Sequence, residues 1–233
     1  FWKWVVAINW YGYLVGEKKR WEIMRAFKKY VAPQIVNEVS KGGEFQISLG
    51  GERREIAAMF VDIRGFTSLS ENLEPEEVVE ILKEYLNLTT HAIFKNGGTL
   101  DKFIGDATMA VFNAPFDLDD YIYRAVCTAR DIVAGAQDLE DRMEKRFHKK
   151  VNFGIGINCG PAVVGNVGCD FRMDYTAIGD TVNTASRLEG KAGASEILIS
   201  EPVYEALKDR IRVTEKGMIP LKGKANEICV YSV

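Results

Sequence analysis

Two aspartates in this chain lie next to apolar runs and close to a glycine. A carboxylate is uncommon in an apolar strand, so each of these aspartates calls for a physical explanation. Asp62 ends the apolar part of Ile56–Thr67 (IAAMFVDIRGFT) and precedes Gly65, and Asp106 lies between the two apolar runs of Leu100–Phe112 (LDKFIGDATMAVF). A buried carboxylate must be paired, hydrogen-bonded or bound to a metal. Two carboxylates from neighbouring strands would form a hard oxygen site suited to Mg²⁺. Each aspartate could instead cap a turn.

A second pair of polar residues lies further along the chain, in Ile178–Glu189 (IGDTVNTASRLE). Asn183 and Arg187 are four residues apart, so on a helix they share one face. An arginine and an amide there could stabilise negative charge on a bound phosphate. By residue type alone, an ordinary helix surface is the better interpretation of such a pair.

Three segments together resemble the class III nucleotide cyclases: FVDIRGFTSLSE, LDKFIGDATMAVF and YTAIGDTVNTASRLE, in that order. The resemblance extends from about Glu52 to the C-terminus. It implies an adenylate cyclase that converts ATP to 3′,5′-cyclic AMP and pyrophosphate. It also implies two Mg²⁺ or Mn²⁺ ions per site, held by Asp62, Asp106 and Ile63. Such ions activate the ribose 3′-hydroxyl and steady the leaving pyrophosphate.

The resemblance further assigns roles around the triphosphate. Asn183 orients the ribose region and Arg187 stabilises charge on the phosphates, while Arg172 is a weaker candidate for binding the triphosphate. A glycine-containing turn after the first aspartate could donate backbone N–H groups to phosphates. The residues expected to bind substrate there are Ile63, Gly65, Phe66 and Thr67.

The choice of purine is expected to depend on Lys102 and Thr176. The family has Lys at the first position in adenylate cyclases and Glu in guanylate cyclases, and a Lys can donate to adenine N1. Adenylate cyclases usually carry Asp at the second position. The threonine hydroxyl found here can still accept from the adenine amino group. A guanylate cyclase, or a catalytically silent dimeric sensory module, remains the alternative.

Sites of this family lie between two cyclase domains, one supplying the metal aspartates and the other the lysine, threonine, asparagine and arginine. This chain holds one such domain with both sets of residues. The resemblance therefore implies a homodimer with two shared sites.

The pattern of apolar runs predicts an α+β fold with a β-α-β-β-α-β core, the ferredoxin-like split βαβ arrangement, with strands and helices added C-terminally. The expected strands are 54–62, the hairpin 100–112, 151–158, 162–167, 172–178, 197–200, 212–216 and 227–232. The expected helices are 75–95, 119–143, 181–191 and 202–207.

The N-terminal part has a different character. Residues 1–16 are aromatic and apolar but too short for a full membrane span of about 20 residues, and a basic cluster follows at once. This order predicts the tail of a transmembrane or interfacial segment, with an amphipathic helix packed on a second copy as the alternative. Residues 17–50 are expected to form a helical signal-transducing linker, and residues 51–233 the catalytic domain. The domain would then be the cytoplasmic part of an inner-membrane-anchored protein with an upstream sensor.

The composition excludes few functional classes of protein, but it agrees with a cyclase domain. The formal net charge is −3 over 233 residues, which does not favour a nucleic-acid-binding surface. The four cysteines lack the spacing of a metal site and are expected to be buried free thiols, as in a reducing compartment.

Overall fold

The computed structural model describes residues 50–147, 151–169, 171–221 and 227–233. The expectations for residues 1–49, the membrane-proximal tail and most of the helical linker, lie outside these residues. The elements in chain order are β1 (Gly50–Arg64), α3 (Phe66–Ser70), α4 (Pro75–Lys95), β2 (Thr99–Ile104), β3 (Ala107–Phe112), α5 (Tyr121–Phe147), β4 (Asn152–Cys169), β5 (Arg172–Ile178), α6 (Asp180–Glu189), β6 (Glu196–Ser200), α7 (Glu201–Leu207), β7 (Thr214–Ile219) and β8 (Ile228–Ser232).

The strands form one eight-stranded sheet in the order β2-β3-β1-β4-β6-β8-β7, and β5 pairs with β4 outside this path. The first four strands, with α4 and α5, are the predicted β-α-β-β-α-β unit, and the remaining elements are additions to it. The α+β prediction is therefore confirmed.

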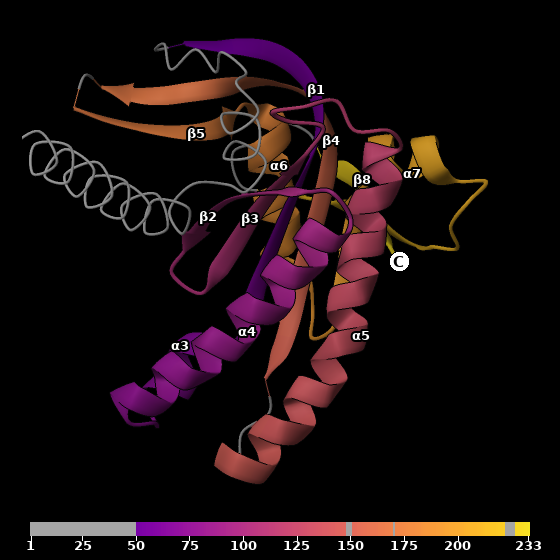
Figure 1. Cartoon of the computed structure of the whole chain (residues 1–233). Helices are drawn as coiled ribbons and strands as arrows, with labels where there is room; N and C mark the ends of the chain where they lie inside the picture. The colour runs from indigo at the N-terminus through magenta and orange to yellow at the C-terminus, as the bar shows by residue number, and fades with distance from the viewer. Residues whose placement is uncertain (1–49, 148–150, 170, 222–226) are drawn as a thin grey trace, which may run out of the picture. The chain divides into compact units, whose positions relative to one another are not determined.

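Two layers of helices cover the sheet, and the side chains of β1 alternate between them. The helices α4 and α5 lie side by side on one face, and α6 packs on the other (Figure 1). The β1 side chains facing α4 and α5 are Ala57, Met59, Val61 and Ile63; those facing α6 are Ile56, Ala58 and Phe60. Asp62 continues the second set, so its side chain lies on the α6 face.

The strand β4 is longer than the sequence predicts. We expected two strands separated near Gly160 and Pro161, but β4 continues through both residues, paired along its length with the 15-residue β1. On its other edge β4 pairs with β6 at residues 154–157 and with β5 at residues 163–169. Pro161 falls between these two partners, so on this edge no strand needs its missing N–H. The two long strands bend together along their length (Figure 1).

The four cysteines are free thiols, as expected, but the prediction that they are buried is wrong. Cys169 is exposed and the other three are partly exposed. Cys169 and Cys229 lie near strand ends, Cys159 within β4 and Cys127 on α5, and at each place the apolar sequence context did not ensure burial. Among the described residues, no helix has the length and apolar character needed to cross a membrane.

Candidate active site

Asp62 and Asp106 meet at one end of the sheet, as the sequence predicts. Asp62 is near the end of β1, and Asp106 lies in the turn between β2 and β3, where Gly105 adopts a φ of 64°. The antiparallel pairing of Val61 with Thr108 places the two carboxyl groups next to each other, and they are hydrogen-bonded. Burial, and then the neighbouring Asp106, raise the pKa of Asp62 from 3.8 to about 6. Two carboxyl groups held so close favour a shared proton or a bound cation.

A buried tyrosine fixes the end of the strand that carries Asp62. The Tyr85 hydroxyl, on α4, donates to the Val61 carbonyl oxygen at 2.8 Å. Its ring is fully buried and stacks on Phe153 of β4 at 5.1 Å between centroids. Burial raises the pKa of Tyr85, so the hydroxyl stays neutral and remains a donor.

The turn after Asp62 is short and tight. Gly65 has a φ of 71°, a left-handed conformation that suits glycine, and the five-residue helix α3 begins directly after it. Phe66 and Thr67 open this helix, so their N–H groups precede its first hydrogen-bonded turn. Ile63 differs from the other expected ligands, because its side chain is buried in the core. Only its backbone could contact a metal or a phosphate.

Asn183 and Arg187 lie on the outward face of α6, exposed and partly exposed respectively. The opposite face of the helix packs closely on β4. A Cβ atom at Gly156 would lie 2.1 Å from the backbone nitrogen of Glu189 and 2.4 Å from the carbonyl oxygen of Ala185. The glycine is therefore what allows α6 to approach the strand closely enough to hold its polar face in place.

An ion pair ties the end of α6 to β1, the strand that bears Asp62. Arg64 contacts the Glu189 carboxylate and donates to the Glu189 carbonyl oxygen at 2.9 Å. The exposed fractions of the two side chains are 23% and 11%. Gly154 leaves room for the guanidinium, since a Cβ there would lie 2.2 Å from Arg64 Nε.

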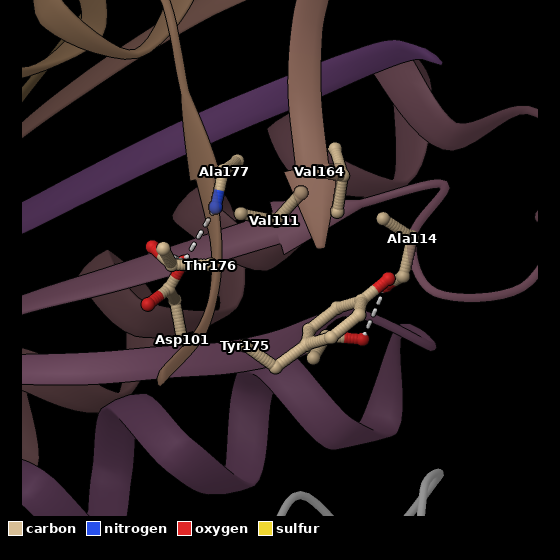
Figure 2. A pocket seen from close by; sticks show the side chains of 8 residues that line it. Asp101, Val111, Ala114, Val164, Tyr175, Thr176 and Ala177 are labelled. Atoms are coloured by element: carbon tan, nitrogen blue, oxygen red, sulfur yellow. Dashed lines mark hydrogen bonds between the residues drawn. The ribbon is translucent and has the colours of Figure 1, made fainter. Parts of the chain in front are cut away.

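Lys102 and Thr176 are brought together through a third residue, Asp101. Thr176 Oγ1 donates to Asp101 Oδ2 at 2.7 Å, and the Ala177 N–H donates to the same oxygen at 3.2 Å (Figure 2). Lys102 Nζ lies 3.3 Å from Asp101 Oδ1. This cluster borders a small pocket between β2, β3 and β5, whose other lining residues are Thr99, Val111, Ala114, Val164 and Tyr175. Arg172 begins β5, and the structure does not describe its side chain.

The aspartate pair and Thr176 occupy different places on the sheet. Asp62 lies opposite Gly154 of β4, whereas Thr176 lies opposite Gly165, 11 residues further along the same strand. The shorter path runs along β2: Thr176 contacts Asp101, which precedes Asp106 by five residues, about 17 Å along an extended strand. Within one chain Thr176 and the aspartate pair are therefore not adjacent.

Comparison with known proteins shows the family of this chain. A family model described as the adenylate and guanylate cyclase catalytic domain matches residues 51–233. This chain belongs to the class III nucleotide cyclases.

The similar proteins include cyclases of both purine specificities. Adenylate cyclase 1 of Rhizobium meliloti (strain 1021) is 35% identical over 212 residues, which are 89% of this chain and 31% of that protein. The adenylyl cyclase CyaB from P. aeruginosa is 40% identical, with a TM-score of 0.77 over 79% of this chain and 96% of the other. The guanylyl cyclase Cya2 is 35% identical, with a TM-score of 0.75 over 79% and 94%. The chain thus spans about a third of the length of the Rhizobium meliloti protein.

Three residues that support this cyclase site were not found by sequence reasoning: Arg64, Asp101 and Glu189. Arg64 and Glu189 are 125 residues apart, and only the fold joins them. Asp101 did carry a signal, because it is a carboxylate beside Lys102 within an apolar strand. Its partner Thr176 is 75 positions away, so the reason for its burial could not be read from nearby residues.

Proposed function

We propose that this cyclase domain converts ATP to 3′,5′-cyclic AMP and pyrophosphate, with divalent ions held by Asp62 and Asp106. The observation that carries the proposal is the pairing of β1 with β3, which sets the Asp62 and Asp106 carboxyl groups beside each other. Burial and the second carboxyl group raise the pKa of Asp62 to about 6. Such a pair is poorly stabilised by the protein alone near neutral pH, and a divalent cation would relieve the repulsion.

The donor set fits Mg²⁺ or Mn²⁺, because it consists of hard oxygen atoms: two carboxyl groups and the backbone of Ile63. Two such ions would lower the pKa of the ribose 3′-hydroxyl and offset charge on the triphosphate. The residues of the chain bind and orient the substrate. Asn183 positions the ribose region, and Arg187 donates to phosphate oxygens as negative charge develops there.

Further phosphate contacts come from two places. Arg172 is a candidate donor to the triphosphate. The backbone at Gly65, Phe66 and Thr67 offers N–H groups at the start of α3, close in sequence to Asp62.

Lys102 favours ATP over GTP as the substrate. An ammonium group can donate to adenine N1, which is an acceptor, whereas the corresponding position of guanine carries an N–H donor. The similarity to both CyaB and Cya2 does not choose between the two purines, so the choice depends on these side chains.

A second copy of the chain is the expected partner, and two observations support it. The aspartate pair and Thr176 are separated along the sheet of one chain. Large apolar side chains are also exposed on β2, β4 and β5 and the turn between the last two: Phe103, Ile104, Val163, Phe171, Met173 and Ile178. An isologous dimer would cover such residues and complete two equivalent sites.

We further propose the division of the chain into residues 1–16, 17–50 and 51–233, with the middle segment transmitting an input from an upstream sensor. Anchoring at the inner membrane, with the catalytic domain in the cytoplasm, belongs to the same proposal. It is supported by the aromatic and basic pattern of the first 20 residues.

The proposed function is tested by assaying the purified chain with ATP and with GTP, in Mg²⁺ and in Mn²⁺. Asp62→Ala and Arg187→Ala should each abolish cyclic AMP formation, and Arg130→Ala, a loss of an exposed helical arginine, should not. Mixing the two inactive variants should restore about a quarter of wild-type activity, because random exchange yields half heterodimers with one intact site each. Cyclic GMP as the main product would refute the choice of purine. No rescue in verified heterodimers would refute the shared sites.

A further inference from the structure

Asp101 is a buried carboxylate to which the proposed chemistry assigns no role. Its side chain is only 3% exposed, although the neighbouring Lys102 side chain is 36% exposed. Burying a carboxylate is costly unless it is paired and hydrogen-bonded. The groups that offset this cost belong to, or directly follow, residues expected to contact the purine: Lys102, Thr176 and Ala177. They offset it in part, because burial still raises the pKa of Asp101.

The hydrogen bonds at Asp101 define the direction of the Thr176 hydroxyl. Asp101 Oδ2 accepts the Ala177 N–H at 3.2 Å, and in the ionised carboxylate this oxygen has a second lone pair for another donor. The other oxygen lies 3.3 Å from the Lys102 ammonium, where an added proton would be repelled. Thr176 Oγ1, 2.7 Å from Oδ2, must therefore be the donor in their contact.

A hydroxyl has one proton and two lone pairs. With its proton committed to Asp101, Thr176 can offer only lone pairs to a ligand. Adenine presents an amino group at position 6, a donor that these lone pairs can accept. Guanine presents a carbonyl oxygen there, which would face another acceptor. A free threonine hydroxyl could rotate and donate to that carbonyl, and would discriminate poorly.

We propose that Asp101 is a specificity-determining positioning residue, which fixes Thr176 as an acceptor and holds Lys102 beside it, so that the pair selects adenine over guanine. The inference rests on the proposed function, because it concerns how that site recognises ATP. Asp101 acts through its neighbours and does not itself contact the base. Its position also explains how a threonine can take the place of the aspartate more usual at this position in adenylate cyclases.

The experiment uses the full 233-residue chain and compares three single variants, Asp101→Ala, Asp101→Asn and Thr176→Val. A double variant combines Asp101→Ala with Thr176→Val. The readout is the ratio of kcat/KM for ATP to that for GTP. The same ratio is measured as Kd with non-hydrolysable ATP and GTP analogues. Asp101→Ala is expected to lower the ratio about tenfold, the value of one discriminating hydrogen bond.

Thr176→Val removes the hydroxyl that Asp101 orients, so its effect on the ratio should overlap with that of Asp101→Ala. The double variant should therefore lose little more than either single variant. Thr176→Ser keeps the hydroxyl and should keep the wild-type ratio. Asp101→Asn preserves size but can offer an N–H to the threonine, and its ratio should fall by at least about threefold. If Asp101→Ala does not fold, the ratio measured for Asp101→Asn decides whether Asp101 sets the preference for ATP.

The possible failures can be told apart. A wild-type preference for GTP would overturn the proposed function. A wild-type preference for ATP that the Asp101 variants retain, with kcat falling equally for both nucleotides, would show that Asp101 only joins β2 to β5. Additive losses of the ratio in the double variant would show that Asp101 does not act through Thr176, and would overturn the inference as well.

Discussion

Replacing Asp62 with asparagine is expected to stabilise the metal-free domain near neutral pH while abolishing its response to divalent cations. In the folded protein, burial and Asp106 raise the pKa of Asp62 from 3.8 to about 6. A raised pKa means that folding favours the protonated carboxyl, so its contribution to stability is present below about pH 4 and lost as pH rises through 6. Asparagine carries no charge at any pH and avoids this loss.

The size of the effect follows from the pKa. A difference from 3.8 to about 6 corresponds to about 3 kcal/mol at 1.36 kcal/mol per pH unit. Because Asp62 is only half-buried, solvent screening reduces this figure, and we expect Asp62→Asn to raise the free energy of unfolding by about 1–2 kcal/mol at pH 7.5. Near pH 4 both proteins should be equally stable.

The measurement is urea unfolding in EDTA at several pH values, repeated with saturating Mg²⁺ or Mn²⁺. Wild type should gain about 2.7 kcal/mol at a metal concentration 100 times the Kd, and Asp62→Asn should gain much less. Asp141→Asn is the matched control, because it removes an exposed carboxylate from α5 far along the chain from the site. Destabilisation by Asp62→Asn in EDTA at pH 7.5, or an equal metal response in both proteins, would contradict the interpretation of the aspartate pair.

Two further predictions concern the groups that support the site. Gly156→Ala should lower the free energy of unfolding by about 1–3 kcal/mol and reduce cyclase activity, because its Cβ would lie 2.1 Å from the Glu189 nitrogen. Gly190→Ala, whose nearest Cβ contact would be at 3.7 Å, is the control and should behave as wild type in urea unfolding. Tyr85→Phe leaves the Val61 carbonyl without its 2.8 Å donor and should cost about 1–2 kcal/mol by the same measurement. Unchanged stability would mean that the end of β1 does not depend on this bond.

The sequence allowed much of the aspartate pair to be predicted, because both residues sit in local patterns. Alternating apolar residues identify the strands, and glycine at 65 and 105 marks the turns beside the two aspartates. The hairpin of β2 and β3 then needs only nearby residues to form. Its pairing with β1 brings Asp106 to Asp62, as the order of the motifs suggested.

Other features depend on register and on distant contacts, which no short segment encodes. The length of β4 was missed because Gly160 and Pro161 have the composition of a turn, yet pairing with β1 carries the strand through them. The Asp101–Thr176 bond arises from the packing of β2 against β5, elements 75 residues apart at this contact. Strand register is specified by the whole buried face and cannot be read from one strand alone.

Burial raises the pKa of both Asp62 and Asp101, but the groups around the two carboxyls act in opposite directions. Around Asp101 the Thr176 hydroxyl, the Lys102 ammonium and the Ala177 N–H favour the charged carboxylate and offset part of the rise. At Asp62 the second carboxyl group, Asp106, adds to the rise that burial causes. A carboxylate surrounded by donors from its own chain can orient those donors, as we propose for Asp101. A carboxyl group held beside another is stabilised by a proton or a bound cation, and binding a cation is the property expected of a metal ligand.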